Sequence, residues 1–261
     1  MMSASPLITV VTATTGDPRV MQAIESVSAQ SHKNIQHLVV LDNPRAPADI
    51  KAAIRQQGVD MIELPYPTGK DRFNGHRIYG ASAFLGKGDF FCFLDEDNWF
   101  DPDHIASLLD VVQRGFSWAF SFRKIVDADG SFICNDDCES LGKWPAILGD
   151  EDFLVDTSCY FLPRPIAVQS SPVWYRKFRD PHIMDVDRAL VAWLHKNTFN
   201  YDTSGRYSLN YRVGSTANSV QREFFLEGNQ RMLRKHQGKL PWHHRRGLSP
   251  APRVSVTLGI S

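Results

Sequence analysis

The chain has 261 residues, and its 29 Lys and Arg balance 29 Asp and Glu, so its formal charge is zero. That balance argues against a dedicated nucleic-acid binder, which needs a basic face toward the phosphates. No apolar run approaches the roughly 20 residues that cross a bilayer, and the N-terminus lacks the basic and long apolar segments of a signal peptide. We therefore expect a soluble cytoplasmic protein with one large α/β domain, alone or with an appendage.

The first third of the chain alternates predicted strands with predicted helices. Residues 5–17 are a β-branched run that ends in small polar side chains, and residues 18–30 continue with helical, amphipathic spacing. Residues 35–41 are a second apolar strand that ends at Asp42, and residues 62–64 suggest a third. Strands that alternate with helices predict a parallel sheet, whose ligand crevice lies along the edge where the strands' carboxyl ends meet.

An acidic triplet, Asp95-Glu96-Asp97, directly follows the apolar run at residues 89–94. Side chains alternate along a strand, so we expect Asp95 and Asp97 on one face and Glu96 on the other. Mg²⁺ is commonly held by one or two carboxylates, while waters and substrate phosphates fill its other positions. This Asp-x-Asp motif therefore predicts a site for a metal-bound diphosphate, and an ordinary acidic turn is the alternative.

The second half of the chain starts a new set of elements. Residues 102–112 have helical spacing, and residues 116–122 begin a strand directly after Gly115. An Asp-Gly pair within residues 126–132 predicts a β-hairpin between apolar stretches. Residues 221–236 form an amphipathic stretch that becomes increasingly basic. We therefore expect a soft boundary near Gly115 and a helical segment near the C-terminus.

Four stretches of the sequence carry a resemblance to a known family. They are residues 7–14, residues 23–42, residues 88–97, and residues 187–194 with the strand that follows at 207–212. Over residues 6 to about 213 the chain resembles the inverting glycosyltransferases of the GT-A fold, family 2 type. The resemblance implies a Rossmann-like α/β fold with a mixed, mainly parallel sheet flanked by helices. It also implies transfer of a sugar from a nucleotide-diphosphate donor to a hydroxyl acceptor.

The same resemblance suggests how the chain is divided. Residues 1–215 would form the GT-A domain, with a nucleotide-binding half at 1–115 and an acceptor half at 116–215 on one continuous sheet. Residues 216–261 would form a basic, helical C-terminal extension. That extension could close over the donor diphosphate, join another subunit, touch an anionic membrane surface or simply pack on the domain, and we favour the last.

The metal site follows from the resemblance. Asp97 would ligate Mn²⁺ or Mg²⁺ directly, and Asp95 would contact the metal, its water shell or the donor's ribose. Glu96 would be structural or would support the ligands. The family often has a further histidine ligand shortly after a Tyr-Arg pair, but Tyr211–Thr216 contains none. The resemblance therefore implies fewer metal ligands from the protein here.

The nucleotide site also follows from the resemblance. Thr12, Ala13 and Thr14 would face the nucleotide. Asp42 would recognise the base, typically through uracil N3–H, which favours a UDP-sugar; a turn cap is the alternative role. Arg77 lies two residues before the position where the family often has an Arg-Asn pair. A phosphate or sugar contact and a solvated position on a helix both stay open for Arg77.

Inverting transfer requires a base that takes the proton from the acceptor hydroxyl. In the family this base is an Asp at the start of a helix after the acceptor strands, and both Asp187 and Asp185 fit. Asp187 is the first choice, because it lies one turn before the apolar stripe formed by Leu190, Trp193 and Leu194. Either carboxylate would also serve as a helix cap.

The expected partners are a nucleotide-sugar donor and a saccharide or lipid-linked acceptor, as in bacterial surface polysaccharide or glycolipid synthesis. Residues 152–161 correspond to the wall that receives the acceptor. Peripheral contact with the inner membrane face and a homo-oligomer are compatible with this interpretation. Two rivals stay open: a nucleotidyltransferase, although residues 13–17 lack a basic phosphate loop, and a catalytically silent nucleotide-sugar-binding protein of the same fold.

Overall fold

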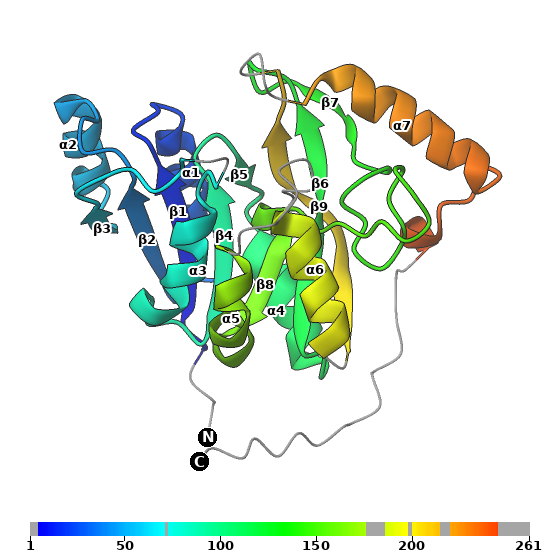
Figure 1. Ribbon diagram of the computed structural model, residues 1–261, viewed down its shortest axis with the longest axis horizontal. Coiled ribbons are helices and arrows are strands. Elements are labelled where there is room, and N and C mark those ends of the chain that lie inside the picture. Colours follow the sequence, from blue (N-terminus) through cyan, green and yellow to red (C-terminus); the bar gives the residue numbers. More distant parts are fainter. Residues whose placement is uncertain (1–4, 71–72, 176–185, 198–199, 215–219, 245–261) are drawn as a thin grey trace.

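The computed structural model describes residues 5–70, 73–175, 186–197, 200–214 and 220–244 (Figure 1). Its elements, in chain order, are β1 (Ile8–Thr14), α1 (Val20–Ser28), β2 (Ile35–Leu41), α2 (Ala48–Gln56), β3 (Asp60–Glu63), α3 (His76–Leu85), β4 (Phe90–Asp95), β5 (Trp99–Phe100), α4 (His104–Gln113), β6 (Trp118–Val126), β7 (Phe132–Asn135), the short helix η1 (Thr157–Cys159), β8 (Tyr160–Pro163), α5 (Arg164–Ser170), η2 (Ser171–Val173), α6 (Val186–Asn197), β9 (Tyr201–Arg212), α7 (Arg222–Lys235) and η3 (Pro241–His244).

One mixed sheet forms the centre of the molecule. Its strands follow the order β3-β2-β1-β4-β8-β6-β9-β5, and β7 pairs with β6 outside this path. The first four strands in that order are parallel to one another, while β8 is antiparallel to both β4 and β6. β9 runs parallel to β6. The mixed, mainly parallel sheet that the sequence predicted is confirmed.

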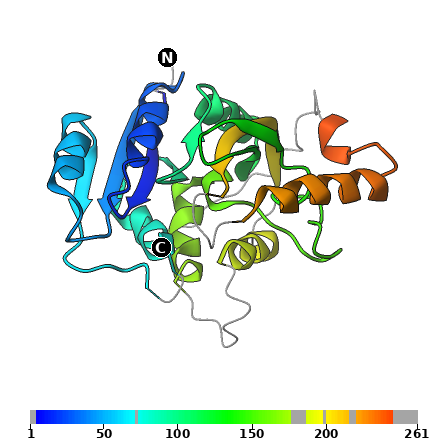
Figure 2. The same ribbon diagram turned by 90° about the horizontal axis from the view of Figure 1, so that it is seen from above.

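Helices cover both faces of the sheet. Figure 2 shows α1 and α4 on one face and α3, α5 and α6 on the other. α2 packs beside α1, with Ile54 against Val20 and Ile24 in a small apolar cluster of their own. α7 lies at the end of the molecule opposite α2 (Figure 1). No helix in the described part of the chain is long and apolar enough to span a bilayer.

The strands next to the crevice are buried along their length, which explains their continuous apolar sequences. In β1 every residue is buried, and in β4 residues 91–94 are buried as well. In β6 the rings of Trp118, Phe120 and Phe122 are wholly inaccessible to solvent. Burying a side chain of this size stabilises the fold by about 1.5–3 kcal/mol. The strand ends that carry the acidic residues are therefore fixed by the core behind them.

The predicted elements of the second half are present, with boundaries that differ by a few residues. The hairpin predicted at residues 126–132 joins β6 to β7, and the helix predicted at 102–112 is α4. The C-terminal amphipathic helix is α7, which buries Phe225 and Met232 against the domain. Asn229 on α7 donates to the carbonyl of Asn135 at 2.7 Å. Within the described residues, the extension thus packs on the domain.

Candidate active site

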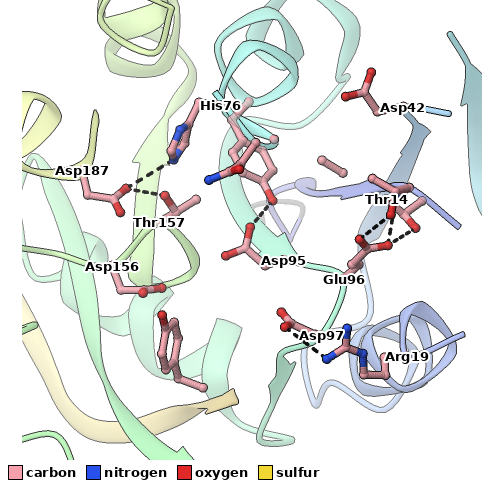
Figure 3. A pocket seen from close by; sticks show the side chains of 16 residues that line it. Thr14, Arg19, Asp42, His76, Asp95, Glu96, Asp97, Asp156, Thr157 and Asp187 are labelled. Atoms are coloured by element: carbon pink, nitrogen blue, oxygen red, sulfur yellow. Dashed lines mark hydrogen bonds and ion pairs between the residues drawn. The ribbon is translucent and has the colours of Figure 1, made fainter. Parts of the chain in front are cut away.

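A cavity of about 560 Å³ opens where β1 and β4 end (Figure 3). It is also lined by the start of α3, by η1 and by the first turn of α6. The described residues that line it are Ala13, Thr14, Thr15, Arg19, Asp42, Asn74, Gly75, His76, Tyr79, Asp95, Glu96, Asp97, Asp156, Thr157, Asp187 and Tyr211. Among them, six carboxylates face one arginine and one histidine. The cavity is therefore strongly acidic.

Most of the side chains proposed from the sequence meet in this cavity. They are Ala13, Thr14, Asp42, Asp95, Asp97 and Asp187. They come from the ends of three neighbouring strands and from the start of α6. Parallel strands bring their carboxyl ends to one edge of a sheet, and this explains why residues so distant in sequence gather.

Two other predicted residues, Thr12 and Arg77, are not among the described residues of the lining. Thr12 is wholly buried, and its hydroxyl lies 2.9 Å from His37 Nε2. Arg77 donates to the carbonyl of Thr68 at 2.5 Å and stacks on the Phe73 ring, with its guanidinium carbon 3.8 Å from the centroid. Asp185 lies outside the described residues. Thr12 and Arg77 therefore contact residues that are not part of the described lining.

Asp42 holds a loop at one end of the cavity. Its Oδ1 accepts from the backbone N–H of Thr68 at 2.6 Å, and its Oδ2 accepts from that of Gly69 at 2.9 Å. A Cβ atom at Gly69 would lie 2.7 Å from the carbonyl oxygen of Asn74, so the loop requires glycine there. Each carboxylate oxygen has two lone pairs. Asp42 thus retains acceptor capacity toward a ligand in the cavity.

Within the acidic triplet, Glu96 turns away from Asp95 and Asp97 toward Thr14 (Figure 3). Asp95 accepts from the Tyr79 hydroxyl at 2.6 Å. Glu96 turns to the loop after β1 and accepts from the Thr14 hydroxyl at 2.5 Å and the backbone N–H of Asp17 at 3.2 Å. These contacts agree with the structural role expected for Glu96, because they connect the end of β4 to the loop after β1.

Asp97 lies beside two arginines. Its Oδ2 is 3.5 Å from Arg19 Nη1, and its backbone carbonyl accepts from Arg212 Nε at 3.1 Å. Arg212 belongs to the Tyr-Arg pair after which the expected histidine is missing. Burial raises the pKa of Asp97, while the charges of Arg19 and Arg212 oppose that rise. Asp97 therefore contacts Arg212, the residue directly before the segment in which a histidine ligand was sought.

Burial and crowding of like charges perturb the other acids. Burial raises the pKa of Asp95 to about 7, and the nearby charge of Asp156 adds to the rise, while the Tyr79 hydroxyl opposes it. Burial likewise raises the pKa of Glu96. Carboxylates crowded in a partly dry site favour either protons or a bound cation. Such perturbed groups in a cavity are typical of functional sites.

The donor set at Asp95 and Asp97 fits a hard divalent cation. Carboxylate oxygens suit Mg²⁺ and Mn²⁺. Across the described ranges, however, no three His, Cys, Asp or Glu side chains are arranged to hold a metal ion. Protein ligands alone would therefore leave such a cation incompletely coordinated, and waters and a diphosphate would have to supply the remaining oxygens.

Asp187 lies at the other end of the cavity, in the first turn of α6. Its Oδ1 accepts from the Thr157 hydroxyl and is 3.9 Å from His76 Nε2. Thr157 begins η1, which Asp156 caps by accepting from the backbone N–H of Ser158 at 2.9 Å. The Ser158 hydroxyl in turn accepts from the backbone N–H of Asp95 at 3.2 Å. η1 thus connects the triplet to Asp187.

Several of the lining residues were assigned no individual role from the sequence. They are Thr15, Arg19, Asn74, Gly75, His76, Tyr79, Asp156, Thr157 and Tyr211. Asp156 and Thr157 fall inside residues 152–161, which were expected to form the acceptor wall. The sequence gave only a weak indication that Arg19 lines the cavity, namely its position two residues beyond the small polar loop after β1. The positions of His76 and Tyr79 depend on how α3 packs, which no local pattern shows.

Comparison with known families identifies the class of the protein. Residues 9–143, just over half of the chain, match the family described as Glycosyl transferase family 2. The chain belongs to this family, and it is a glycosyltransferase with the GT-A fold. The nucleotidyltransferase alternative is therefore set aside. Comparison with curated protein sequences finds no match.

Solved structures support the same fold at low sequence identity. S. aureus TarS 1-349 in complex with UDP is 12% identical with a TM-score of 0.58, over 88% of this chain and 71% of that one. The complex of the same TarS fragment with UDP-GlcNAc gives the same identity and TM-score over 88% and 66%. The mannosyltransferase PcManGT from Pyrobaculum calidifontis, in complex with GDP-Man and Mn2+, is 12% identical with a TM-score of 0.56, over 92% and 67%.

Proposed function

We propose that the protein is a metal-dependent, inverting glycosyltransferase that moves a sugar from a nucleotide-diphosphate donor, with UDP favoured, to a hydroxyl acceptor. The observation that carries this proposal is that aspartate side chains lie at three places along one cavity. Asp42 lies at one end, Asp95 and Asp97 lie in the middle, and Asp187 lies at the other end (Figure 3). The order matches the order of base, diphosphate and acceptor in a bound donor–acceptor pair.

The nucleotide end of the proposal rests on Asp42 and the end of β1. Asp42 is buried, yet it lines the cavity and retains lone pairs that would accept a base N–H. Thr14, at the end of β1, lines the cavity near it. The TarS structures contain UDP or UDP-GlcNAc, while the mannosyltransferase contains GDP-Man. Uracil, whose N3–H donates, is one base that suits an acidic acceptor here.

The diphosphate would be held with the help of Asp97 and Asp95. A divalent cation bound there would stabilise the negative charge that develops on the departing nucleoside diphosphate. Mn2+ accompanies the donor in the mannosyltransferase structure. Of the residues of this chain, Tyr79 orients the Asp95 carboxylate through its hydroxyl, and Glu96 fixes the loop along which the phosphates would lie.

Asp187 is the base that we assign to the acceptor hydroxyl. It would accept the hydroxyl proton as the acceptor oxygen attacks the anomeric carbon from the side opposite the leaving diphosphate. The Thr157 hydroxyl donates to one oxygen of the Asp187 carboxylate, and this bond fixes the orientation of the carboxylate. In this proposal residues 1–115 hold the nucleotide, and residues 116–215 provide the base and the acceptor wall.

The test has a binding part and a turnover part. Thermal unfolding would be measured with UDP, GDP, CDP and dTDP, each with and without Mn²⁺. A ligand at one hundred times its dissociation constant stabilises the fold by about 2.7 kcal/mol, and we expect UDP with Mn²⁺ to give the largest shift. No shift with any of the four nucleotides would refute the donor site.

The turnover part compares two variants. Asp187→Asn should keep the UDP and Mn²⁺ shift but lose transfer from a UDP-sugar. Asp110→Asn is the control, because Asp110 is exposed on α4 and lies outside the cavity lining. Full transfer by Asp187→Asn would remove Asp187 from the base role. Retention of configuration at the anomeric carbon of the product would refute the inverting mechanism.

A further inference from the structure

Arg19 brings a positive charge into the acidic cavity. It is the residue directly before α1, and its side chain is 31% exposed. Among the described residues of the lining it is the one arginine or lysine. A donor diphosphate that enters the cavity would therefore meet this guanidinium as the nearest protein cation on the lining.

Asp17 holds the Arg19 side chain in place. Asp17 Oδ1 accepts from Arg19 Nε at 2.9 Å, and Oδ2 accepts from Nη2 at 2.6 Å. The same Oδ1 accepts from the Arg19 backbone N–H at 2.9 Å. The backbone N–H of Asp17 donates to Glu96 at 3.2 Å. The guanidinium is thus pre-organised by a short chain of contacts that leads back to the acidic triplet.

The remaining edge of the guanidinium is directed at Asp97. Arg19 Nη1 lies 3.5 Å from Asp97 Oδ2, which is within ion-pair range but beyond a good hydrogen bond. The hydrogen bonds that Arg19 donates to Asp17 raise the pKa of Arg19, so the guanidinium stays charged. A planar guanidinium with one edge fixed and one edge open suits a phosphate oxygen, because its donors match phosphate geometry.

We propose that Arg19 is a diphosphate-binding residue, which faces Asp97 in the donor-free protein and binds a donor phosphate oxygen when a divalent cation takes Asp97. This inference rests on the proposed function, because it assigns a second cationic contact to the same donor. Two cations beside one carboxylate repel each other, so Arg19 should weaken cation binding while the anion is absent. An anionic diphosphate placed between them is attracted by both. Donor and cation should therefore strengthen each other's binding, and such coupling is reciprocal.

The experiment measures the binding of Mn²⁺ and UDP by isothermal titration calorimetry, without any turnover. The proteins are wild type, Arg19→Gln, Arg19→Lys and Arg206→Gln. Arg206 is a matched control, because it is an exposed arginine that pairs with Asp103 away from the cavity lining. Mn²⁺ is titrated without nucleotide, and UDP is titrated at saturating Mn²⁺.

Arg19→Gln should bind UDP about tenfold more weakly at saturating Mn²⁺, because a charge-assisted hydrogen bond is lost. It should bind Mn²⁺ alone several-fold more tightly, because Asp97 no longer has a competing cation. Arg19→Lys keeps the positive charge but lacks the planar guanidinium. Its Mn²⁺ affinity should therefore stay near that of wild type, and its UDP affinity should lie between those of wild type and Arg19→Gln. Arg206→Gln should match wild type in both titrations.

Opposite changes in the two affinities are the signature of the proposal. Equal UDP affinity in wild type and Arg19→Gln would overturn the phosphate contact, and an unchanged or weaker Mn²⁺ affinity would overturn the competition at Asp97. Both results leave the proposed function intact if wild type binds UDP with Mn²⁺. Absence of UDP binding by wild type itself would instead refute the proposed function and this inference together.

Discussion

Replacing the buried Arg123 with Met should be the most damaging single change in the second half of the sheet. The guanidinium of Arg123, on β6, has a side-chain exposure of 3% and contacts three carboxylates. Its nitrogens lie 2.7 Å from Asp136, 2.5 Å from Glu139 and 2.5 Å from Asp156. The Tyr211 ring covers it, with its centroid 4.2 Å from the guanidinium carbon. Met fills a similar volume but leaves the three acids without this cation.

The expected cost follows from the burial of the cluster. Removing one partner of a buried ion pair destabilises a protein by about 3–5 kcal/mol, because a buried charge is left uncompensated. Burial alone would raise the pKa of Asp136, but Arg123 and nearby backbone N–H groups hold it below its ordinary value. Arg123→Met should therefore lower the free energy of unfolding by about 3–5 kcal/mol near neutral pH, a large part of the roughly 5–15 kcal/mol of an ordinary domain.

Urea unfolding, followed by circular dichroism at pH 7.5, measures this loss. Arg206→Met is the control, because exposed ion pairs contribute only about 0–1 kcal/mol. A loss below about 1 kcal/mol for Arg123→Met, similar to that of the control, would refute the reasoning. It would mean that the three carboxylates are solvated or protonated in the folded protein, and that Arg123 does not compensate them.

Three further changes test other parts of the structure. Burial lowers the pKa of His104 from 6.5 to about 3, so the unfolded chain binds a proton that the fold excludes, and stability should fall as pH drops below 6.5. Between pH 7.5 and pH 5, the free energy of unfolding measured with urea should fall by about 2 kcal/mol less in His104→Gln than in wild type. Gly142→Ala should destabilise by about 2 kcal/mol or more in the same assay, because φ is +61° and the new Cβ would lie 2.3 Å from the Phe120 ring. Thr157→Val should lower kcat about tenfold at an unchanged donor KM, since Asp187 loses an orienting hydrogen bond. The first expectation would be contradicted if His104→Gln and wild type responded equally to pH. The second would be contradicted if Gly142→Ala left the stability unchanged, and the third if Thr157→Val left kcat unchanged.

The parallel half of the sheet was predictable because its signals are local. Each strand there is an apolar run that stops at polar residues, and the topology of parallel strands brings those stops to one edge. That rule alone was enough to propose that Asp42, Asp95 and Asp97 lie together. Thr12 is an instructive exception. It lies two residues before the end of β1, and its side chain contacts His37 on the neighbouring strand rather than the cavity.

The other half of the cavity was less predictable because tertiary packing builds it. Asp156 and Thr157 belong to η1, a three-residue helix that no periodic pattern reveals. Their position depends on β8, which runs antiparallel between β4 and β6, and on the buried Arg123 that holds Asp156. The contact of Arg77 with the carbonyl of Thr68 likewise depends on how the loop before α3 folds back. Sequence spacing carries no record of such loop geometry.

The acidic side chains of the cavity differ in how far the protein itself compensates their charge. Backbone N–H groups hold Asp42 and Glu96, and a buried arginine holds Asp156. These three acids are therefore compensated by the fold itself. Asp95 and Asp97 lie beside the middle of the cavity, where Arg19 is the one nearby cation of the described lining, and burial raises the pKa of each carboxyl. A diphosphate would add further negative charge at this place, so it should bind well only together with a cation. Metal dependence is thus the consequence that this distribution of charge predicts most directly.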